Sequence, residues 1–222
     1  MNRTNLIPAA TKFCCCICIL LLSILTGCSS SLKFQVKSDI PTPLVSKIPL
    51  VIGVYYTDKF KNYSYHENSA ERKNWDIESG PSQVAMFDQV LPSMFKQVKH
   101  INSLPLTGDE AGIQAVLIPS IEEMQFSLPA ETHLDMYEVW IKYKLRLQDA
   151  KGNVIAEWSV TAYGKSSTKF LKNREKGLND AMDLALRDAG AKIALGFSKE
   201  AGVNQWLASH VGKCTGQPEK TC

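Results

Sequence analysis

The side chains of this 222-residue sequence that could do chemistry include four histidines, His66, His100, His133 and His210. No two of them have the spacing of metal ligands, and only His210 lies near cysteines, those of the C-terminal pair. We therefore predict scattered surface histidines, no metal site and no cofactor.

Glu122 and Glu123 form an acidic pair beside a predicted strand. Two apposed carboxylates push their pKa values apart, as in an acid–base dyad. Adjacent residues of a strand point to opposite faces, however, which favours a solvated strand edge. The sequence has no Gly-x-Ser-x-Gly elbow, phosphate-binding glycine loop or zinc-protease motif. We expect no enzyme, and a hydrolase with a non-standard site is the catalytic alternative.

A basic stripe of Lys142, Lys144 and Arg146 lies on the polar side of a predicted strand, next to Trp140. These residues could contact phospholipid headgroups, lipopolysaccharide phosphate or a glycan. The alternative is a sheet surface on which lysines prevent aggregation. We favour the alternative, because the neighbouring Glu138 weakens any field that would attract anions.

The cysteine with the most specific surroundings is Cys28. It follows an apolar run, 13–25, which itself follows a short segment containing Arg3, Lys12 and no acid. This layout is typical of an export signal, and the run is too short to span a bilayer. The motif Leu25-Thr26-Gly27-Cys28 resembles a bacterial lipobox, where the cysteine is lipidated and the chain is cut before it. An ordinary signal peptide that contains a cysteine is the alternative.

The lipobox resemblance implies a membrane anchor of acyl chains, palmitate among them, on Cys28. Each buried methylene contributes about 0.8 kcal/mol, so more than one chain makes a stable anchor. Ser29 and Ser30 follow, and the lack of Asp there resembles outer-membrane cargo facing the periplasm. Removing 27 of 222 residues leaves 195, enough for one domain. The net charge of the whole chain, +3, is too small for a nucleic-acid binder.

Cys214 and Cys222 remain in the mature chain besides Cys28. We expect them to form a disulfide, because an exported protein meets an oxidising compartment and Gly216 and Pro218 can turn the chain back. Two free thiols in a C-terminal tail are the alternative.

The periodicity of apolar residues predicts the elements that must position these side chains. They are a strand over 48–56, a helix over 81–98 kinked at Pro92, a short strand over 101–106, a strand over 115–128 interrupted at Pro119, a hairpin of 137–148 with 154–163, a helix over 174–197 and a short helix over 203–209. Small residues of the last long helix (Ala181, Ala185 and Ala189) would allow close approach to a sheet.

This order predicts an α+β fold, a mostly antiparallel sheet with two main helices packed on one face. The expected divisions are a signal peptide over 1–27, a flexible lipidated tether over 28–47, the α+β domain over 48–198 and a C-terminal extension over 199–222 with a short helix and the cysteine loop.

A long polar stretch, 57–80, contains Tyr63, Tyr65 and Trp75. Loops of this length are usually functional or disordered, and exposed Tyr and Trp suit recognition of a partner. The alternative is a hairpin of 63–65 against 75–77 that packs on the sheet. The sequence leaves both interpretations open, and both could hold.

The element order, the turn Asp149-x-x-Gly152-Asn153 and the alanine-rich final helix resemble small periplasmic lipoproteins with an αβ sandwich. YajG-type lipoproteins, the curli-secretion lipoprotein CsgG and the N-terminal domain of TolB share this look, over 50–197 of this chain. The resemblance implies an accessory or scaffold role in envelope assembly or transport, and it brings no catalytic residues.

We therefore expect a non-enzymatic outer-membrane lipoprotein that faces the periplasm and binds another envelope component, either a protein machine or peptidoglycan. The first alternative is a protein that binds lipid, lipopolysaccharide or a glycan through the sheet face around Trp140 and Lys144. The sequence leaves the oligomeric state open.

Overall fold

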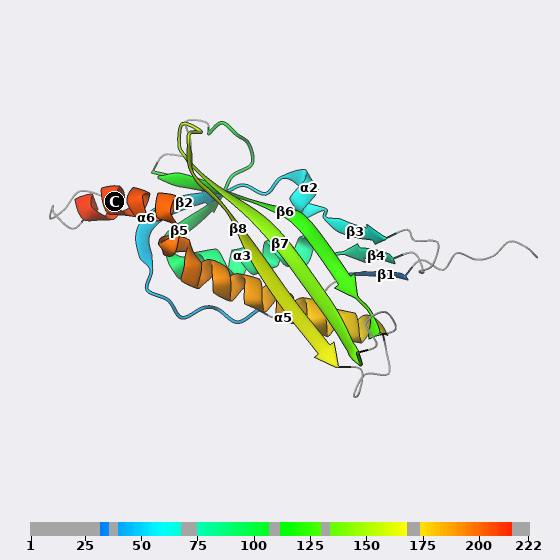
Figure 1. The fold of residues 1–222 in the computed structure, drawn as a ribbon. Helices are drawn as coiled ribbons and strands as arrows, with labels where there is room; N and C mark the ends of the chain where they lie inside the picture. The colour runs from blue at the N-terminus through cyan, green and yellow to red at the C-terminus, as the bar shows by residue number, and fades with distance from the viewer. Residues whose placement is uncertain are drawn as a thin grey trace, which may run out of the picture.

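The computed structural model describes residues 32–35, 40–67, 75–106, 112–129, 134–167 and 174–214. Its centre is a five-stranded sheet in the order β5-β2-β6-β7-β8 (Figure 1). The strands are β2 (Ile48–Val54), β5 (Phe95–His100), β6 (Ala115–Ser127), β7 (Met136–Asp149) and β8 (Val154–Ser167). The long strands β6, β7 and β8 pair antiparallel, whereas the short β2 pairs parallel with β5 and β6. The predicted α+β fold with a mostly antiparallel sheet is confirmed.

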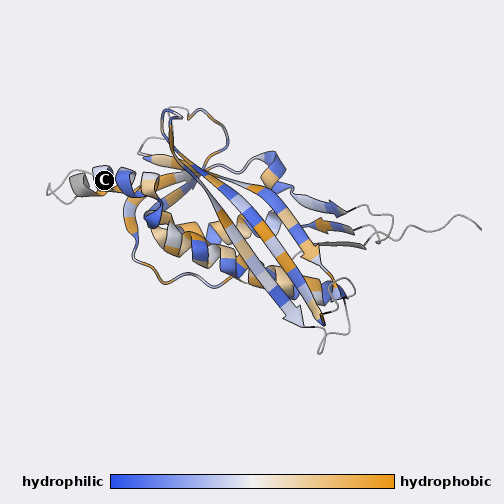
Figure 2. Ribbon diagram, viewed as in Figure 1, coloured by the Kyte–Doolittle hydropathy of each residue, from blue (hydrophilic) through white to orange (hydrophobic). Residues whose placement is uncertain are grey.

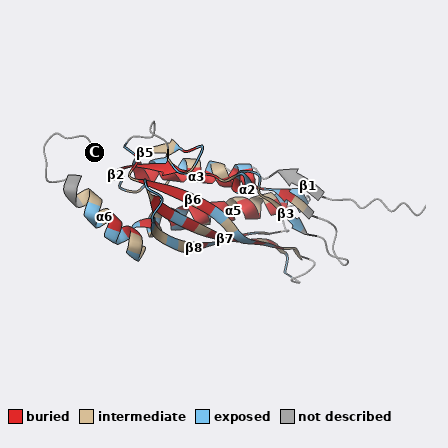
Figure 3. Cartoon of the chain, turned by 90° about the horizontal axis from the view of Figure 1, so that it is seen from above, coloured by how far each residue is buried: buried red, intermediate tan, exposed pale blue. Residues whose placement is uncertain are grey.

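Two long helices, α3 (Gly80–Met94) and α5 (Arg174–Gly196), lie on the same face of this sheet (Figures 1 and 3). One continuous core joins them to the strands, with Phe87 of α3, Tyr143 of β7 and Leu186 of α5 all fully buried. The prediction of two main helices on one face is therefore confirmed.

Strict alternation along β7 explains why the sheet has one apolar and one polar side. The inward residues are Tyr137, Val139, Ile141, Tyr143, Leu145 and Leu147, all buried. Figure 2 shows the same alternation of hydropathy along β6 and β7. Full burial of one such side chain contributes about 1.5–3 kcal/mol, so this register is strongly specified.

Helix α5 approaches β8 more closely than any side chain at the contact would permit. A Cβ atom on Gly164 would lie 2.1 Å from the Ala181 carbonyl oxygen and 2.3 Å from the Ala185 amide nitrogen. Ala181, Ala185 and Ala189 are fully buried, which confirms that small residues on this helix allow close approach to the sheet.

One polar pair lies inside the core. The Tyr143 hydroxyl donates a hydrogen bond to Gln83 Oε1 of α3, and both side chains are buried. Burial raises the pKa of Tyr143 far above its ordinary value, so the phenol stays neutral and keeps its donor. The bond joins the middle of the sheet to the first turns of the helix.

The predicted boundaries around β5 are wrong. Helix α3 ends at Met94, two residues after Pro92, and Phe95 and Val98 belong to β5 instead of the helical stripe. No strand spans 101–106, a segment that contains a cis peptide bond between Leu104 and Pro105. Proline restricts the helix near its end, and the chain then continues directly as a strand.

Strand β6 is continuous through Pro119, which pairs with Leu145, so the predicted interruption is wrong. The described pairing of β6 with β2 ends at Leu117. Pro119 therefore occupies an edge position, as its missing amide hydrogen requires. The irregularity of the strand lies three residues later, between Ile121 and Glu123.

A small second sheet lies beside the first, with the order β1-β4-β3 (Figure 1). Its strands are β1 (Leu32–Gln35), β3 (Ser64–Glu67) and β4 (Trp75–Glu78), and the short helix α2 (Asp58–Lys61) precedes β3. Strand β1 pairs parallel with β4. It falls within the predicted tether, as do Ile40 and Val45, which pack against the core. The described part of that segment therefore lies against the domain.

The chain ends its described part with a 3₁₀ turn, η3 (Phe197–Lys199), and α6 (Ala201–Cys214). Helix α6 is longer than the predicted 203–209, and Val203 and Trp206 are buried in the main core. Among the described residues, no helix is both long and apolar enough to cross a membrane.

Candidate functional site

The basic stripe on the outer face of the sheet is matched by acids from the neighbouring strands. Lys142 Nζ lies 3.1 Å from Glu122 Oε2 of β6, and Lys144 Nζ lies 3.4 Å from Glu157 Oε2 of β8. Arg146 also pairs with Glu157. The hydrogen bond from Lys142 lowers the pKa of Glu122, and those from Arg146 and Lys144 lower the pKa of Glu157. Both acids therefore stay ionised and offset the stripe, in line with the favoured interpretation of a protected surface.

A bulge in β6 explains the position of the acidic pair. Glu123 is opposite Lys142 in the ladder, and Glu122 is the extra residue at the register shift. Both carboxylates are exposed, and Glu122 reaches the same lysine. The expectation that they point to opposite faces is wrong, because a bulge re-aims a side chain. Their solvated position is confirmed, and the lowered pKa of Glu122 does not suit a general acid.

Trp140 borders a hollow of about 360 Å³ on this outer face, lined by Gln125, Ser127, Glu138, Trp140 and Tyr163. Gln125, Trp140 and Tyr163 are direct neighbours in the ladder across β6, β7 and β8. Trp140 is half-buried, whereas Tyr163 is 42% exposed. The Tyr163 hydroxyl donates to Glu138, and this bond raises the pKa of Tyr163 to about 12. The phenol is therefore neutral near pH 7.

The predicted aromatic residues of 57–80 lie in and beside the small sheet. Strands β3 and β4 form an antiparallel pair in which Tyr65 is opposite Ile77, so the predicted hairpin is present. The Tyr65 ring lies 4.9 Å from the Phe126 ring, and Tyr63 is half-buried, which raises its pKa. The side chain of Trp75 lies outside the described residues. Tyr65 thus has a packing role, and recognition of a partner by this hairpin stays a prediction.

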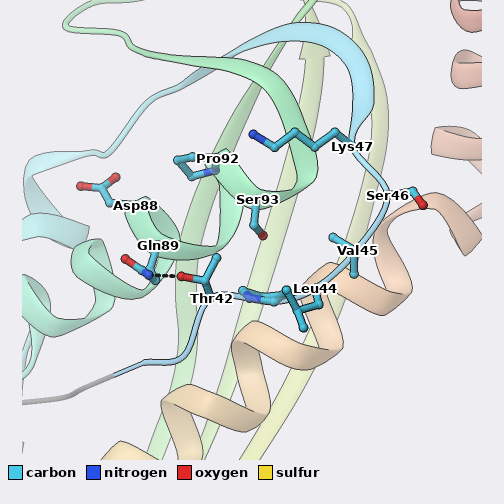
Figure 4. Close-up of a pocket in the computed structure, with 10 residues that line it drawn as sticks. Thr42, Leu44, Val45, Ser46, Lys47, Asp88, Gln89, Pro92 and Ser93 are labelled. Carbon is cyan, nitrogen blue, oxygen red and sulfur yellow. Dashed lines mark hydrogen bonds between the residues drawn. The ribbon is translucent and has the colours of Figure 1, made fainter.

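A second hollow, about 650 Å³, lies between the segment 42–47 and α3 (Figure 4). Within its lining, the Gln89 side chain donates to the Thr42 hydroxyl, and Lys47 extends toward Pro92. Asp88 is the acid of its lining. Of the hydroxyl groups in this lining, that of Thr42 accepts from Gln89 and that of Ser93 donates to the Val90 carbonyl oxygen.

Asp88 also belongs to a polar cluster that sequence reasoning missed. Its Oδ1 accepts a hydrogen bond from the Tyr56 hydroxyl at 2.7 Å and lies 3.3 Å from His100 Nε2. Burial, reinforced by Asp88, raises the pKa of Tyr56 well above its ordinary value, so Tyr56 stays a neutral donor. The cluster connects the ends of β2 and β5 to α3. The three residues are far apart in sequence, so no local pattern could have found them.

The other sequence-predicted sites are separate or lie outside the described residues. His66 lies 3.2 Å from Asp76, and His210 Nδ1 lies 2.9 Å from the Trp206 carbonyl oxygen. Within the described ranges, no group of three or more His, Cys, Asp or Glu side chains could hold a metal ion.

The remaining predicted sites are His133, Cys28, Cys214 and Cys222. His133, Cys28 and Cys222 lie outside the described residues, as does the side chain of Cys214, although its backbone ends α6. Lipidation of Cys28 and a bond between Cys214 and Cys222 stay predictions.

No protein-family model and no curated protein matches this chain. Among solved structures, it is similar to a DUF330 protein from Xanthomonas campestris, with 11% identity, 83% of this chain and 99% of that chain covered, and a TM-score of 0.46.

Two further similar structures are described as lipoproteins. One is a minor lipoprotein from Acinetobacter baumannii, with 13% identity, coverage of 75% and 95%, and a TM-score of 0.35. The other is a lipoprotein from Neisseria meningitidis, with 12% identity, coverage of 76% and 100%, and a TM-score of 0.30. At identities and TM-scores this low, the likeness carries no conclusion about what this chain binds or does.

Proposed function

We propose that this chain is a lipid-anchored, non-catalytic protein of the bacterial cell envelope, held in the outer membrane and facing the periplasm, where it binds another envelope component. The observation that carries this proposal is the motif Leu25-Thr26-Gly27-Cys28 after an export-type apolar run. The described residues support it, because their hydroxyl–histidine contacts lie outside both hollows. Ser209 Oγ lies 2.9 Å from His210 Nδ1, and Ser64 and His66 both contact Asp76, but none of these residues lines a hollow described above.

Metabolic labelling with an alkyne fatty acid tests the anchor. The wild-type chain should take up the label, and the mass of its N-terminal peptide should fit an acylated Cys28. Cys28→Ala should lose the label and accumulate as the uncleaved precursor, whereas the matched variant Cys214→Ala should be labelled like the wild type. Label retained in Cys28→Ala, or a mature chain that begins elsewhere, would contradict the proposal. Density separation of the two membranes tests the outer-membrane position.

In-cell crosslinking followed by affinity capture tests the partner. The hairpin with the half-buried Tyr63 and Tyr65 is one candidate contact, so Tyr63→Ala and Tyr65→Ala should be compared for partner capture and for melting temperature. Loss of capture with unchanged melting supports recognition through this hairpin. A lower melting temperature with unchanged capture would mean that these rings serve packing, in agreement with the contact of Tyr65 with Phe126.

Among the alternative ligands for the outer sheet face, anionic lipid is disfavoured. Lys142, Lys144 and Arg146 all have carboxylate partners, so little positive field remains for headgroup phosphates. The specific observation that favours another ligand on this face is the hollow beside Trp140.

A further inference from the structure

The outer face of β6, β7 and β8 carries two flat aromatic side chains where exposed strands usually carry charged or small polar residues. Trp140 and Tyr163 are direct cross-strand neighbours, and both line the hollow of about 360 Å³. Small-molecule sites have volumes of about 300–1,000 Å³ and combine apolar surface with a few polar groups. The size and the aromatic content of the hollow fit that description.

The aromatic residues do not serve the core. The core lies on the opposite face, under α3 and α5, and is complete without them. The Tyr163 backbone is held by α5, because its amide donates to Asp188 Oδ2 at 2.9 Å. Its hydroxyl is fixed by Glu138. A half-exposed tyrosine held at both ends is a rigid surface, which lowers the entropy cost of binding.

The polar groups around the two rings can both donate and accept hydrogen bonds. The amide of Gln125 and the hydroxyl of Ser127 do both, the Glu138 carboxylate accepts, and the Tyr163 oxygen has lone pairs left after donating to Glu138. A ligand rich in hydroxyl groups, each a donor and an acceptor, would complement this ring of groups.

The charges around the hollow nearly balance. Lys142, the next outward residue of β7, is paired with Glu122, and Glu138 is opposite Lys165 in the ladder. Neither a polyanion nor a free cation would gain much from this field. The binding free energy of a neutral ligand does not depend on such a field, so the charge pattern favours an uncharged polar molecule.

We propose that the hollow formed by Gln125, Ser127, Glu138, Trp140 and Tyr163 is a binding site for an uncharged oligosaccharide. The C–H-rich face of a pyranose ring packs on the indole and phenol rings, whose faces are electron-rich. The sugar hydroxyls bond to Gln125, Ser127 and Glu138. This inference deepens the proposed function by naming a class of ligand. It rests on the proposed function only for the cellular location, the periplasm, in which the ligand would be bound.

Isothermal titration calorimetry on the full chain tests the site. The protein is purified in detergent from the cell fraction, membrane or soluble, in which it is found. The probes are cellotetraose and tetra-N-acetylchitotetraose, both uncharged. Binding of either probe should weaken at least about tenfold in Trp140→Ala, as expected for an aromatic anchor. Trp140→Phe keeps a flat ring and should retain most of the affinity. Lys144→Ala, on the same strand and face but outside the hollow, should bind like the wild type.

Gln125→Ala provides a second test that does not depend on an aromatic residue, because Gln125 is exposed and its removal spares the core. It should weaken binding by severalfold at an unchanged melting temperature. The proposal is overturned if neither probe binds at millimolar concentration, or if Trp140→Ala binds as well as the wild type. It is also overturned if the protein binds phosphatidylglycerol vesicles through Lys144 and ignores both sugars. Because the assay needs no acyl chain, its failure is separate from failure of the lipid anchor.

Discussion

The two faces of the five-stranded sheet are built from the same strands but obey different constraints. Along β7, Ile141 and Tyr143 are fully buried under the helices, whereas Lys142 and Lys144, which alternate with them, lie on the outer face. The inner face has no spare room, since a glycine is required where β8 meets α5. The outer face carries the ion pairs and the aromatic hollow described above. The inner face therefore specifies the fold, and the outer face is free to carry a binding function.

The largest effect should come from Gly164→Val on the inner face. A Cβ there would meet two backbone atoms of α5, which no rotamer change can relieve, so the helix must separate from the sheet. Since an ordinary domain has about 5–15 kcal/mol of stability, we expect loss of the folded state. Circular dichroism and urea unfolding measure this. The matched variant Gly196→Ala, where a Cβ meets no atom within 4 Å, should fold normally.

Ile141→Ala should be the next most damaging change. Truncating a fully buried isoleucine leaves a cavity under α3 and α5 and typically costs about 2–5 kcal/mol. Urea unfolding should show a lower midpoint with an unchanged slope. A cost below about 1 kcal/mol would mean that the helices do not pack on this face as described.

Tyr143→Phe should have an intermediate effect. It removes the donor to Gln83 but keeps the ring, and leaves a buried amide oxygen without its bond, at a cost of about 1–3 kcal/mol. Adding Gln83→Leu should recover part of this loss, because both polar partners are then gone. A double-mutant cycle from urea unfolding measures the coupling, and additive losses would argue against the bond.

Lys142→Ala should leave the melting temperature unchanged within error, although it adjoins Ile141. Its ion pair with Glu122 is on the solvent-exposed face, where such pairs contribute little and are screened by salt. Differential scanning calorimetry at low and high salt tests this. A marked fall in melting temperature would show that the outer face also carries folding information.

The smallest effect concerns the titration of Tyr163, which should not change folding near pH 7. Its hydrogen bond to Glu138 raises the pKa from 10.0 to about 12, so the stabilisation is fully present below pH 10 and is lost as pH rises through about 12. Ultraviolet titration of the wild type minus Tyr163→Phe should give that midpoint. Glu138→Gln should move it back toward 10.0, and an unchanged midpoint would contradict the bond.

The difference between the faces also explains what could be predicted from the sequence. The inner face is encoded in local periodicity, so β7, its hairpin with β8 and the buried stripe of α5 were all predicted with nearly correct bounds. Phe95 and Val98 misled the prediction because they continue a helical spacing and also fit a strand. Only the parallel pairing of β5 with β2, a contact distant in sequence, decides between the two.

The outer face depends on register between strands, which periodicity does not reveal. Trp140, Lys142 and Lys144 were identified from β7 alone, but their partners were not. The bulge at Glu122 and the cross-strand position of Tyr163 become visible only once β6, β7 and β8 are aligned. The candidate site was therefore half predictable. Its three strands and Trp140 could be predicted, whereas Gln125 and Tyr163, the cross-strand neighbours of Trp140, could not.

The pairing of β1 with β4 reduces the distance that the domain can move away from a membrane anchor at Cys28. With the proposed lipid on Cys28, only residues 29–31 separate the anchor from β1, at most about 10 Å at ~3.3 Å per residue. A free segment up to β2 would extend about 60 Å, and the accessible volume grows with the cube of length, so pairing shrinks it about two-hundredfold. The effective concentration of the outer sheet face at the membrane surface rises accordingly. With Cys28 lipidated as proposed, a ligand of this protein would be bound close to the membrane surface.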